Sequence, residues 1–521
     1  MKREDLAEIT KKASLVMHDI DVILKKGDRY IPDLSAVHAR MGDETGQAPD
    51  LVRRWVKVPS SGSSMVLAAY IQGLVDRDVV DRDVLAPLLA GRSHPDEWDQ
   101  EALATGDIQA RTSWREILHD LFGGRLLLFA STLPHAWSIG VDKLPSPSIT
   151  TPTSEQSVTG SNEALSTVLG TQMGQIRRSF RHPGLRFQTV TLGRLQRTSV
   201  AIAHLDGLTN PALLASVRQR LERLVIDARP NGNMIADLIR DHPLSIFPTI
   251  RTSSRVDQAC LALEEGKVLV LVDGDPFALI APAPLCDFYR TMMDYGTPWY
   301  DASFVRLLRL LAWGAGLYLP ALYIALTQVN SNLIPSALLI VTVGNHAGLP
   351  FTPLVEVVLM IVIIETVREA AIRLPTGLST TIGTVGAIIV GTVVVRAGIA
   401  SPQVIFIITL TALSFYTTPA YELTGTWRLI NFLLLVGAAS MGIYGIVLVT
   451  VWLIGTLVGL ESFGVPYFEP LAPFHLTDWG DLIVRLPWSL LRNRPTTARP
   501  SYHRRLGPSV RMPDPHLRQR P

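Results

Sequence analysis

Cysteine is almost absent from this chain, which has two in 521 residues, Cys260 and Cys286. Two cysteines provide neither a disulfide framework nor the paired spacing of a zinc site. We interpret both as small buried hydrophobic residues. An apolar signal segment is also missing, since Met1 to Lys12 is charged and amphipathic. We therefore expect no secretory leader and an N-terminal part that stays in the cytosol.

Catalytic motifs are absent too. The sequence contains no phosphate-binding glycine loop, no nucleophile elbow and no paired His/Cys spacing. The run around Asp273, Gly274 and Pro276 looks superficially like a metal or phosphate loop. A strand-ending turn is the better interpretation, because glycine supplies an unusual backbone angle and proline fixes the next one. The sequence indicates a non-enzymatic protein without cofactor or metal.

Net charge is small, at +2, so no overall field favours nucleic acid as a partner. One segment differs: residues from Arg485 to Pro521 include nine arginines and a single acid, Asp514. This stretch is also rich in proline. We predict a cytosolic, arginine-rich tail over 461–521 that is largely disordered from Arg485 onward.

Charge also disappears locally, since Leu429 to Leu460 has no Lys, Arg, Asp or Glu over 32 residues. Such a run is too long for a buried core helix and long enough to span a bilayer. The sequence therefore predicts a transmembrane helical domain over 300–460, following a large soluble head. Its apolar segments are Phe304–Leu326, Pro353–Val367, Leu378–Ala400, Gln403–Ala420 and Leu429–Leu460.

A sixth apolar segment, Leu333–Val343, is too short to span alone and is bracketed by proline and glycine. Such broken stretches are tolerated when buried in protein or lining a cavity. Arg306, Arg309 and the arginine-rich tail place both ends of the domain in the cytosol, which requires an even number of crossings. We favour four full crossings plus a partial segment, with six as the alternative.

The soluble head contains a strand–turn–helix unit twice, at Ser64–Asp76 and Thr198–Asn210. A helix–glycine–strand unit follows each copy, and the key glycines lie 51 residues apart in the first copy and 59 in the second. We interpret these as two α/β subdomains of related topology with covered sheet faces, chance similarity being the alternative. The predicted divisions are a polar segment (1–48), subdomain 1 (49–143), a connector (144–190) and subdomain 2 (191–290).

The connector ends in a basic cluster, a group of four arginines and one histidine. It could bind an anion or an acidic partner, or it could be a solvated helix end. Its members are Arg177, Arg178, Arg181, His182 and Arg186.

Carboxylates occur within an apolar segment at Glu356 and Glu365. Arg368 lies three residues after Glu365, and Arg373 lies four after Glu369, so each pair can meet on one helix face. A carboxylate at membrane depth is costly and is a functional hypothesis by default. We treat these five residues as candidates for coupling or ion pairing. The alternative is an interfacial amphipathic helix whose charges lie in water or pair with each other.

The segment Leu378–Ala400 is built from Gly, Thr, Ala and β-branched residues. On a regular helical wheel one face is small and suited to packing. The opposite face combines hydroxyls with apolar side chains, and could line a narrow wet path. Ordinary packing, with threonines bonded to their own helix, is the alternative. The candidate pore-lining residues are Thr381, Thr384, Val385, Ile388, Thr392 and Val395.

Several short sequence motifs, in order between Pro49 and Asp481, resemble the A subunit of bacterial spore germination receptors, the GerA family. The chain departs from the family pattern in the connector and at Arg255-Val256-Asp257, where Arg-Pro-Asp is usual. The motifs that carry the resemblance are Phe247-Pro248, Glu265–Pro282, Leu319–Leu326, Pro350–Glu356, Arg368–Ala370, Leu374-Pro375 and Ser462–Tyr467.

The resemblance implies a multi-pass protein of the spore inner membrane that works with a transporter-like B subunit and a lipoprotein C subunit. It implies that the B subunit binds the nutrient and that copies of the A subunit form a homo-oligomer with an ion-conducting path. Two alternatives stay open, a secondary transporter and a membrane scaffold that transmits a signal without conducting.

Overall fold

The computed structural model describes residues 30–59, 65–90, 107–141, 155, 160–346, 348–373, 383–384, 386 and 388–505. The chain divides into two compact units. The first contains the α/β part up to Leu279, apart from two short segments. The second contains those segments, Ser154–Gly160 and Asp237–Thr252, together with Ile280–Pro521.

The first helix among the described residues is α2 (Leu34–Thr45), whose N-terminal amides are capped by the Asp33 carboxylate. A five-stranded sheet follows, with strand order β1-β2-β4-β5-β3 and antiparallel pairs. Its strands are β1 (Leu51–Lys57), β2 (Met65–Ile71), β3 (Ile108–Arg111), β4 (Leu126–Ala130) and β5 (Ala136–Ile139). Its helices are α3 (Arg77–Val79), α4 (Ala86–Leu89), with a π-helical stretch between them, and α5 (Trp114–Phe122).

Strand β2 shows why both faces of this sheet are covered. Val66, Ala68 and Tyr70 belong to one buried cluster, with the π-helical stretch and α4. Leu67, Ala69 and Ile71 belong to another, with α2 and α5. Successive strand side chains point to opposite faces, so an unbroken apolar run fits a sheet buried on both sides.

A second five-stranded sheet has the equivalent strand order, β6-β7-β9-β10-β8. The predicted repeat therefore reappears as a shared topology. The turns also match, because Gly73 and Gly207 have φ of 94° and 75°, and Gly124 and Gly266 have φ of 87° and 89°. The strands are β6 (Leu185–Leu192), β7 (Thr198–Leu205), β8 (Arg251–Ser253), β9 (Val268–Val272) and β10 (Ala278–Ala281). The helices are α6 (Leu169–Ser179), α7 (Pro211–Glu222), α8 (Gly232–Ile239) and α9 (Val256–Glu264).

The basic cluster contributes to the joint between these two subdomains. Arg177 of α6 is buried and bonded in two places to the buried carboxylate of Asp50, one contact being Nη2 to Oδ1 at 3.0 Å. Arg178 pairs with Glu163, and Arg186 donates to the carbonyl of Glu44 at 2.7 Å. Arg177 therefore fits neither alternative, because it is buried rather than solvated and a carboxylate of the chain itself neutralises it.

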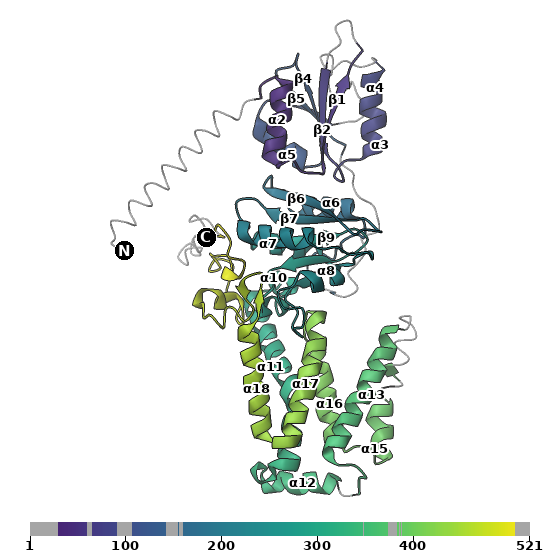
Figure 1. Cartoon of the computed structure of the whole chain (residues 1–521), viewed down its shortest axis with the longest axis vertical. Helices are drawn as coiled ribbons and strands as arrows, with labels where there is room; N and C mark the ends of the chain where they lie inside the picture. The colour runs from purple at the N-terminus through teal and green to yellow at the C-terminus, as the bar shows by residue number, and fades with distance from the viewer. Residues whose placement is uncertain are drawn as a thin grey trace, which may run out of the picture. The chain divides into compact units, whose positions relative to one another are not determined.

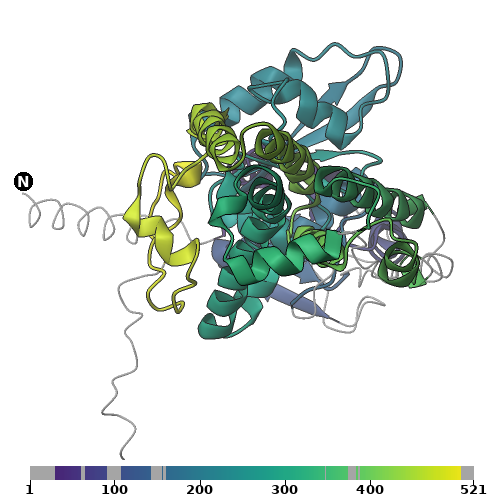
Figure 2. The same cartoon turned by 90° about the horizontal axis from the view of Figure 1, so that it is seen from below.

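The second unit is mainly helical. It contains α10 (Met292–Gly296), α11 (Trp299–Ile324), α12 (Ser336–His346), α13 (Pro353–Arg373), α15 (Val394–Arg396), α16 (Pro402–Tyr416), α17 (Tyr421–Met441) and α18 (Ile443–Gly459). Within this unit the long helices run side by side and α12 lies across one end of them (Figures 1 and 2). Among the described residues, two helices are long and apolar enough to cross a membrane, Trp299–Val329 and Tyr421–Met441. Three further apolar helices, α12, α16 and α18, are shorter.

The uncharged run Leu429–Leu460 was predicted to form one membrane span. It instead forms parts of two helices, α17 and α18. The chain reverses at Gly442, whose φ of 64° and ψ of −139° suit glycine. Close approach of α17 and α18 explains the small residues, because a Cβ on Gly445 would lie 1.9 Å from the Gly437 carbonyl oxygen. Asn330 closes the hairpin by accepting the Ile443 amide at 2.9 Å.

The prediction that disorder starts at Arg485 is also wrong over the described residues. Chain 461–505 forms the hairpin β11 (Glu461–Ser462) and β12 (Val465–Pro466), followed by turns and two 3₁₀ stretches. Arg485 is buried. An arginine-rich composition favours disorder only where the guanidinium groups stay in water, and here one is enclosed by carbonyl groups.

We predict that Asp50→Ala destabilises the joint between the subdomains by about 3–5 kcal/mol, because it leaves the Arg177 charge buried and unpaired. Hydrogen exchange of β1 and α6 in the full chain measures this. Asp81→Ala is the control, since the exposed Arg54–Asp81 pair should contribute about 0–1 kcal/mol. Equal exchange in both variants would contradict the claim that the Asp50–Arg177 pair stabilises the joint.

Candidate functional site

Glu356 is the most completely buried of the predicted coupling residues, with 0% exposure near the start of α13. Its Oε1 lies 3.0 Å from His346 Nδ1, and its Oε2 accepts the Ser401 amide at 2.9 Å. His346 Nε2 in turn lies 2.8 Å from the Tyr323 hydroxyl. This polar chain joins α11, α12, α13 and the N-terminus of α16. The alternative of a solvated carboxylate is wrong for Glu356.

Sequence reasoning did not find the partners of Glu356. Tyr323 stands in an apolar helix, and Ser401 is a single hydroxyl before a proline. His346 gave the best available signal, because it ends an apolar helix ten residues before the glutamate. Nothing local in the sequence states that these residues meet.

Farther along α13, Glu365 contacts Arg368, the predicted i,i+3 pair, and also Arg428 of α17, Nη1 to Oε2 at 3.1 Å. Arg428 was missed because it lies 63 residues away in sequence. Glu369 and Arg373 form the predicted i,i+4 pair at 2.6 Å. Since this second pair is 62% and 78% exposed, it should add little to stability.

The predicted pore-lining stripe is only partly described. Thr381 and Val385 lie outside the described residues. Thr384, Ile388 and Thr392 are exposed, and Val395 is half-buried. The Thr392 hydroxyl donates to the Ile388 carbonyl at 2.7 Å, as in the packing alternative.

The helix carrying this stripe also departs from the regular wheel. Ile389–Val393 is π-helical, and a π turn holds more residues than an α turn. Val395 is therefore rotated relative to Thr384 and Ile388. On the opposite side, Gly386 packs against Val367 of α13, in agreement with the predicted small face.

The turn motif of the α/β part has a structural position. Gly274 has φ of 87°, and Asp273 Oδ1 accepts the Leu169 amide at the start of α6, at 3.0 Å. Pro276 follows in the link to β10. The neighbouring Asp275 accepts the Gly232 amide at 2.6 Å. No group of three or more His, Cys, Asp or Glu residues that could hold a metal occurs in the part of the chain that the structure describes.

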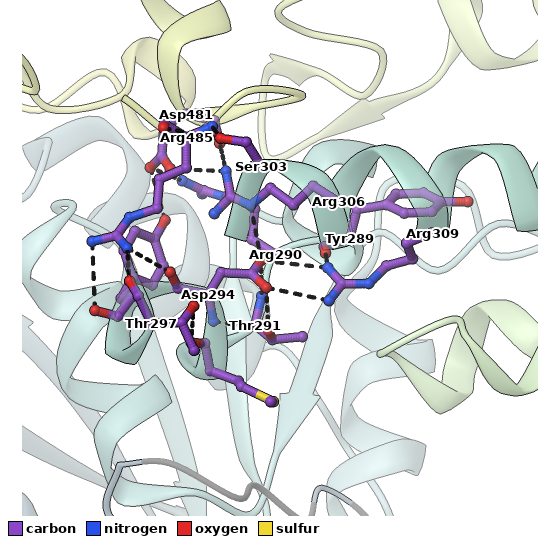
Figure 3. Close-up of polar contacts among 12 residues, drawn as sticks. Tyr289, Arg290, Thr291, Asp294, Thr297, Ser303, Arg306, Arg309, Asp481 and Arg485 are labelled. Atoms are coloured by element: carbon purple, nitrogen blue, oxygen red, sulfur yellow. Dashed lines mark hydrogen bonds and ion pairs between the residues drawn. The ribbon is translucent and has the colours of Figure 1, made fainter. Parts of the chain in front are cut away.

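A buried charged network surrounds the start of α11 (Figure 3). Asp294 of α10 accepts Arg306 Nε at 2.9 Å and Arg309 Nη2 at 3.2 Å. Arg306 also donates to Asp481 Oδ1 at 3.1 Å, from the far C-terminal segment. The network thus ties together two segments almost 190 residues apart in sequence, Asp294 and Asp481.

Arg485 and Arg290 strengthen the same joint. Arg485 Nη1 donates to the Asp294 and Thr297 carbonyls at 2.7 and 2.6 Å. Arg290 contacts Asp287 and also Asp481, the latter at 3.3 Å. Arg306 and Arg309 were predicted only as charges marking the cytosolic side, whereas both are engaged in specific pairs.

Electrostatics favours the ionised carboxylate at Asp294. Burial on its own raises the pKa of this carboxyl, but the guanidinium charges of Arg309 and Arg306 outweigh it, so the pKa lies below its ordinary value.

Outside the network, burial raises the pKa of the Cys260 thiol to about 12, so this cysteine is unreactive.

Two α/β subdomains with one strand order, joined in sequence to a helical unit with long apolar helices, define a class of protein with a membrane-type part. The chain belongs to the family described as Bacillus/Clostridium GerA spore germination protein, whose model matches residues 39–497. The resemblance noted from the sequence is confirmed.

Individual relatives of the chain are also spore germination proteins. The chain is 32% identical to spore germination protein KA of Bacillus subtilis over 89% of this chain and 86% of that protein. It is 31% identical to spore germination protein GerLA of Bacillus cereus, over 89% and 95% respectively. A crystal structure of the N-terminal domain of the A subunit of the Bacillus megaterium spore germinant receptor GerK3 covers 49% of this chain and 96% of that domain, with 24% identity and a TM-score of 0.37.

We predict that Glu356→Ala lowers the thermal unfolding midpoint of the full chain, because the Ser401 amide and His346 each lose a buried partner. Each unpaired group costs about 1–3 kcal/mol. The matched control is Glu369→Ala on the same helix, whose exposed pair should be worth about 0–1 kcal/mol. Equal shifts would show that the polar chain contributes no more than a surface pair.

We also predict acid sensitivity of the C-terminal segment. A lowered carboxylate pKa stabilises the folded state above the ordinary aspartate pKa of about 3.9, and this contribution is lost as the pH falls toward the lowered value. Protection of residues 481–498 from proteolysis should therefore hold from neutral pH to about 4 and decline below it. Asp294→Asn should reduce protection near neutral pH and should converge with the wild type at low pH, whereas Asp301→Asn, a change at an exposed residue of α11, should not reduce protection. Protection that is insensitive to Asp294→Asn would argue against the network.

Proposed function

We propose that this chain is the A-type subunit of a nutrient receptor in bacterial spores, and that several copies assemble around segment 378–400 to form a gated ion-conducting path. The receptor includes a transporter-like B subunit, which binds the nutrient, and a lipoprotein C subunit. Family membership supports the process, since the relatives are spore germination proteins. The sequence resemblance to the A subunit of spore germination receptors supports the subunit type.

One observation carries the conducting role. Thr384, Ile388 and Thr392 are exposed, and on the opposite side of the same segment Gly386 packs against Val367. The following residues, Ile389–Val393, are π-helical, and π-helical turns often occur at functional positions. Copies arranged side by side would turn this face toward water, with Ile388 forming an apolar constriction.

The arrangement of helices supports six crossings rather than four. The chain enters α11 and leaves α18 at the same end of the unit, where Leu285 donates to the Tyr467 carbonyl at 2.8 Å. Dividing the run Leu429–Leu460 at Gly442 adds one crossing, and α13 runs along the bundle to supply another (Figure 1). An even number keeps the α/β part and the tail on one side, the cytosolic side by the positive-inside rule.

Hydrogen bonds to α17 supply a route by which movement elsewhere in the chain is coupled to opening of the proposed ion path. The segment Asp237–Thr252 is hydrogen-bonded to α17 in two places. The Thr252 amide donates to the Glu422 carboxylate of α17 at 2.8 Å. The Thr426 hydroxyl of α17 donates to the Ile246 carbonyl at 2.5 Å. A movement of that segment therefore acts directly on α17. Shifting a two-state helix arrangement requires a few kcal/mol, within reach of differential nutrient binding.

The test is ion release from spores on addition of nutrient. Ile388→Phe should narrow the path and slow ion release about tenfold, which corresponds to about 1.4 kcal/mol of added barrier. Val451→Phe, a change on the exposed face of α18, is the control and should leave release unchanged. Normal release from Ile388→Phe spores with intact receptor complexes would instead favour a scaffold that does not conduct.

A further inference from the structure

A cavity of about 360 Å³ lies between α13, α16 and α17 in the helical unit. Its lining comes from the C-terminal halves of α13 and α16 and from the first half of α17. The start of α17 and the end of α13 lie toward the end of the unit at which α11 begins (Figure 1). A volume of this size is in the range of small-molecule sites, about 300–1,000 Å³.

Most of the cavity wall is apolar. Ile361 and Ile364 line it from α13, Ile408 from α16, and Leu429 and Phe432 from α17. Leu429 and Phe432 are also exposed, so the cavity reaches the outer surface of the helices. Exposed apolar surface of this kind marks contact with a membrane or with another protein.

The charged residues of the lining do not balance. Arg368 of α13 and Arg428 of α17 both contact Glu365 Oε2, Arg428 through Nη1 at 3.1 Å. The next acid along α13, Glu369, pairs with Arg373. Among the described residues, two arginines therefore share one carboxylate, and the cavity lining has one positive charge in excess.

Both guanidinium groups are accessible and have donors to spare. The Arg368 and Arg428 side chains are 16% and 32% exposed. Each guanidinium group has five N–H donors, whereas their partners among the described residues are the Glu365 carboxylate and, for Arg428 Nε, the Thr424 carbonyl at 3.2 Å. Phosphate is a suitable additional acceptor, because guanidinium groups bind it through two parallel hydrogen bonds.

Polar and apolar groups are separated along the cavity. On α13, Ile361 precedes the charged residues, and on α17, which runs in the opposite direction, Phe432 follows Arg428 (Figure 1). Exposed tyrosines, Tyr416 at the end of α16 and Tyr421 at the start of α17, lie at the charged end. Tyrosine is enriched where a membrane meets water. The charged end therefore fits the headgroup level and the apolar end fits acyl chains.

We propose that this cavity binds one anionic phospholipid, with its phosphate on Arg368 and Arg428 and the first part of its acyl chains against Ile361, Ile408 and Phe432. Basic pockets between membrane helices hold anionic headgroups in this way. A phospholipid supplies the anion and the hydrocarbon in one molecule, whereas free phosphate supplies only the anion. The lipid joins α13 to α16 and α17. This site does not depend on whether the assembled chain conducts ions.

The test is native mass spectrometry of the delipidated full chain, titrated with dioleoyl phosphatidylglycerol or dioleoyl phosphatidylcholine. One saturable phosphatidylglycerol per chain is expected, bound about tenfold more tightly than phosphatidylcholine, whose choline group offsets the phosphate charge. Arg428→Gln should weaken phosphatidylglycerol binding about tenfold. Arg373→Gln is the matched control, because it removes the same charge from an exposed position of α13, and it should leave binding unchanged.

A second pair of variants tests the cavity itself and keeps the test informative if Arg428→Gln misfolds. Ala412→Phe narrows the cavity from α16 and should abolish binding, whereas Leu413→Phe, at the exposed neighbouring position, should not. The proposal fails if the two lipids bind equally, or if Arg428→Gln and Arg373→Gln bind alike. It also fails if Ale412→Phe separates assembled copies without changing lipid binding, since a second copy of the chain would then fill the cavity.

Discussion

The pairing of the buried Asp294 carboxylate with Arg306 and Arg309 is the constraint on which the helical unit depends. A carboxylate at this depth is tolerated only when it is ionically paired and hydrogen-bonded. Both guanidinium groups belong to the first turns of α11, and Arg306 extends the pairing to Asp481. The start of the first long helix and the segment around Asp481 are therefore fixed to each other.

The same requirement explains the interior of the unit. Asn431 of α17 donates to the Gly316 and Leu317 carbonyls of α11, each at 2.9 Å, so an amide secures these two helices. Glu356 does the same at the other end by joining α12, α13 and α16. The proposed conducting path concerns a different part of the unit, the face at Thr384, Ile388 and Thr392.

The α/β part was predictable because its signals are local. Unbroken apolar strands and glycines at matched turns, such as Gly73 and Gly207, are written into the sequence and give the repeated topology. The helical unit was less predictable because its decisive features are not local. Gly442 reverses the chain inside a run with no polar break, and glycine is common in ordinary membrane helices. The π turn at Ile389–Val393 shifts the helical wheel, and Arg485 is buried only because Asp294 and Thr297 present carbonyls to it.

Whether the exposed face around Ile388 contacts water is the central question, and thiol accessibility answers it most directly. Both native cysteines are buried, so an introduced cysteine reports alone. In assembled receptors, a charged water-soluble thiol reagent should modify Ile388→Cys, should react faster when nutrient is present, and should not modify Val451→Cys on α18. Protection of Ile388→Cys equal to that of Val451→Cys, with and without nutrient, would contradict the account.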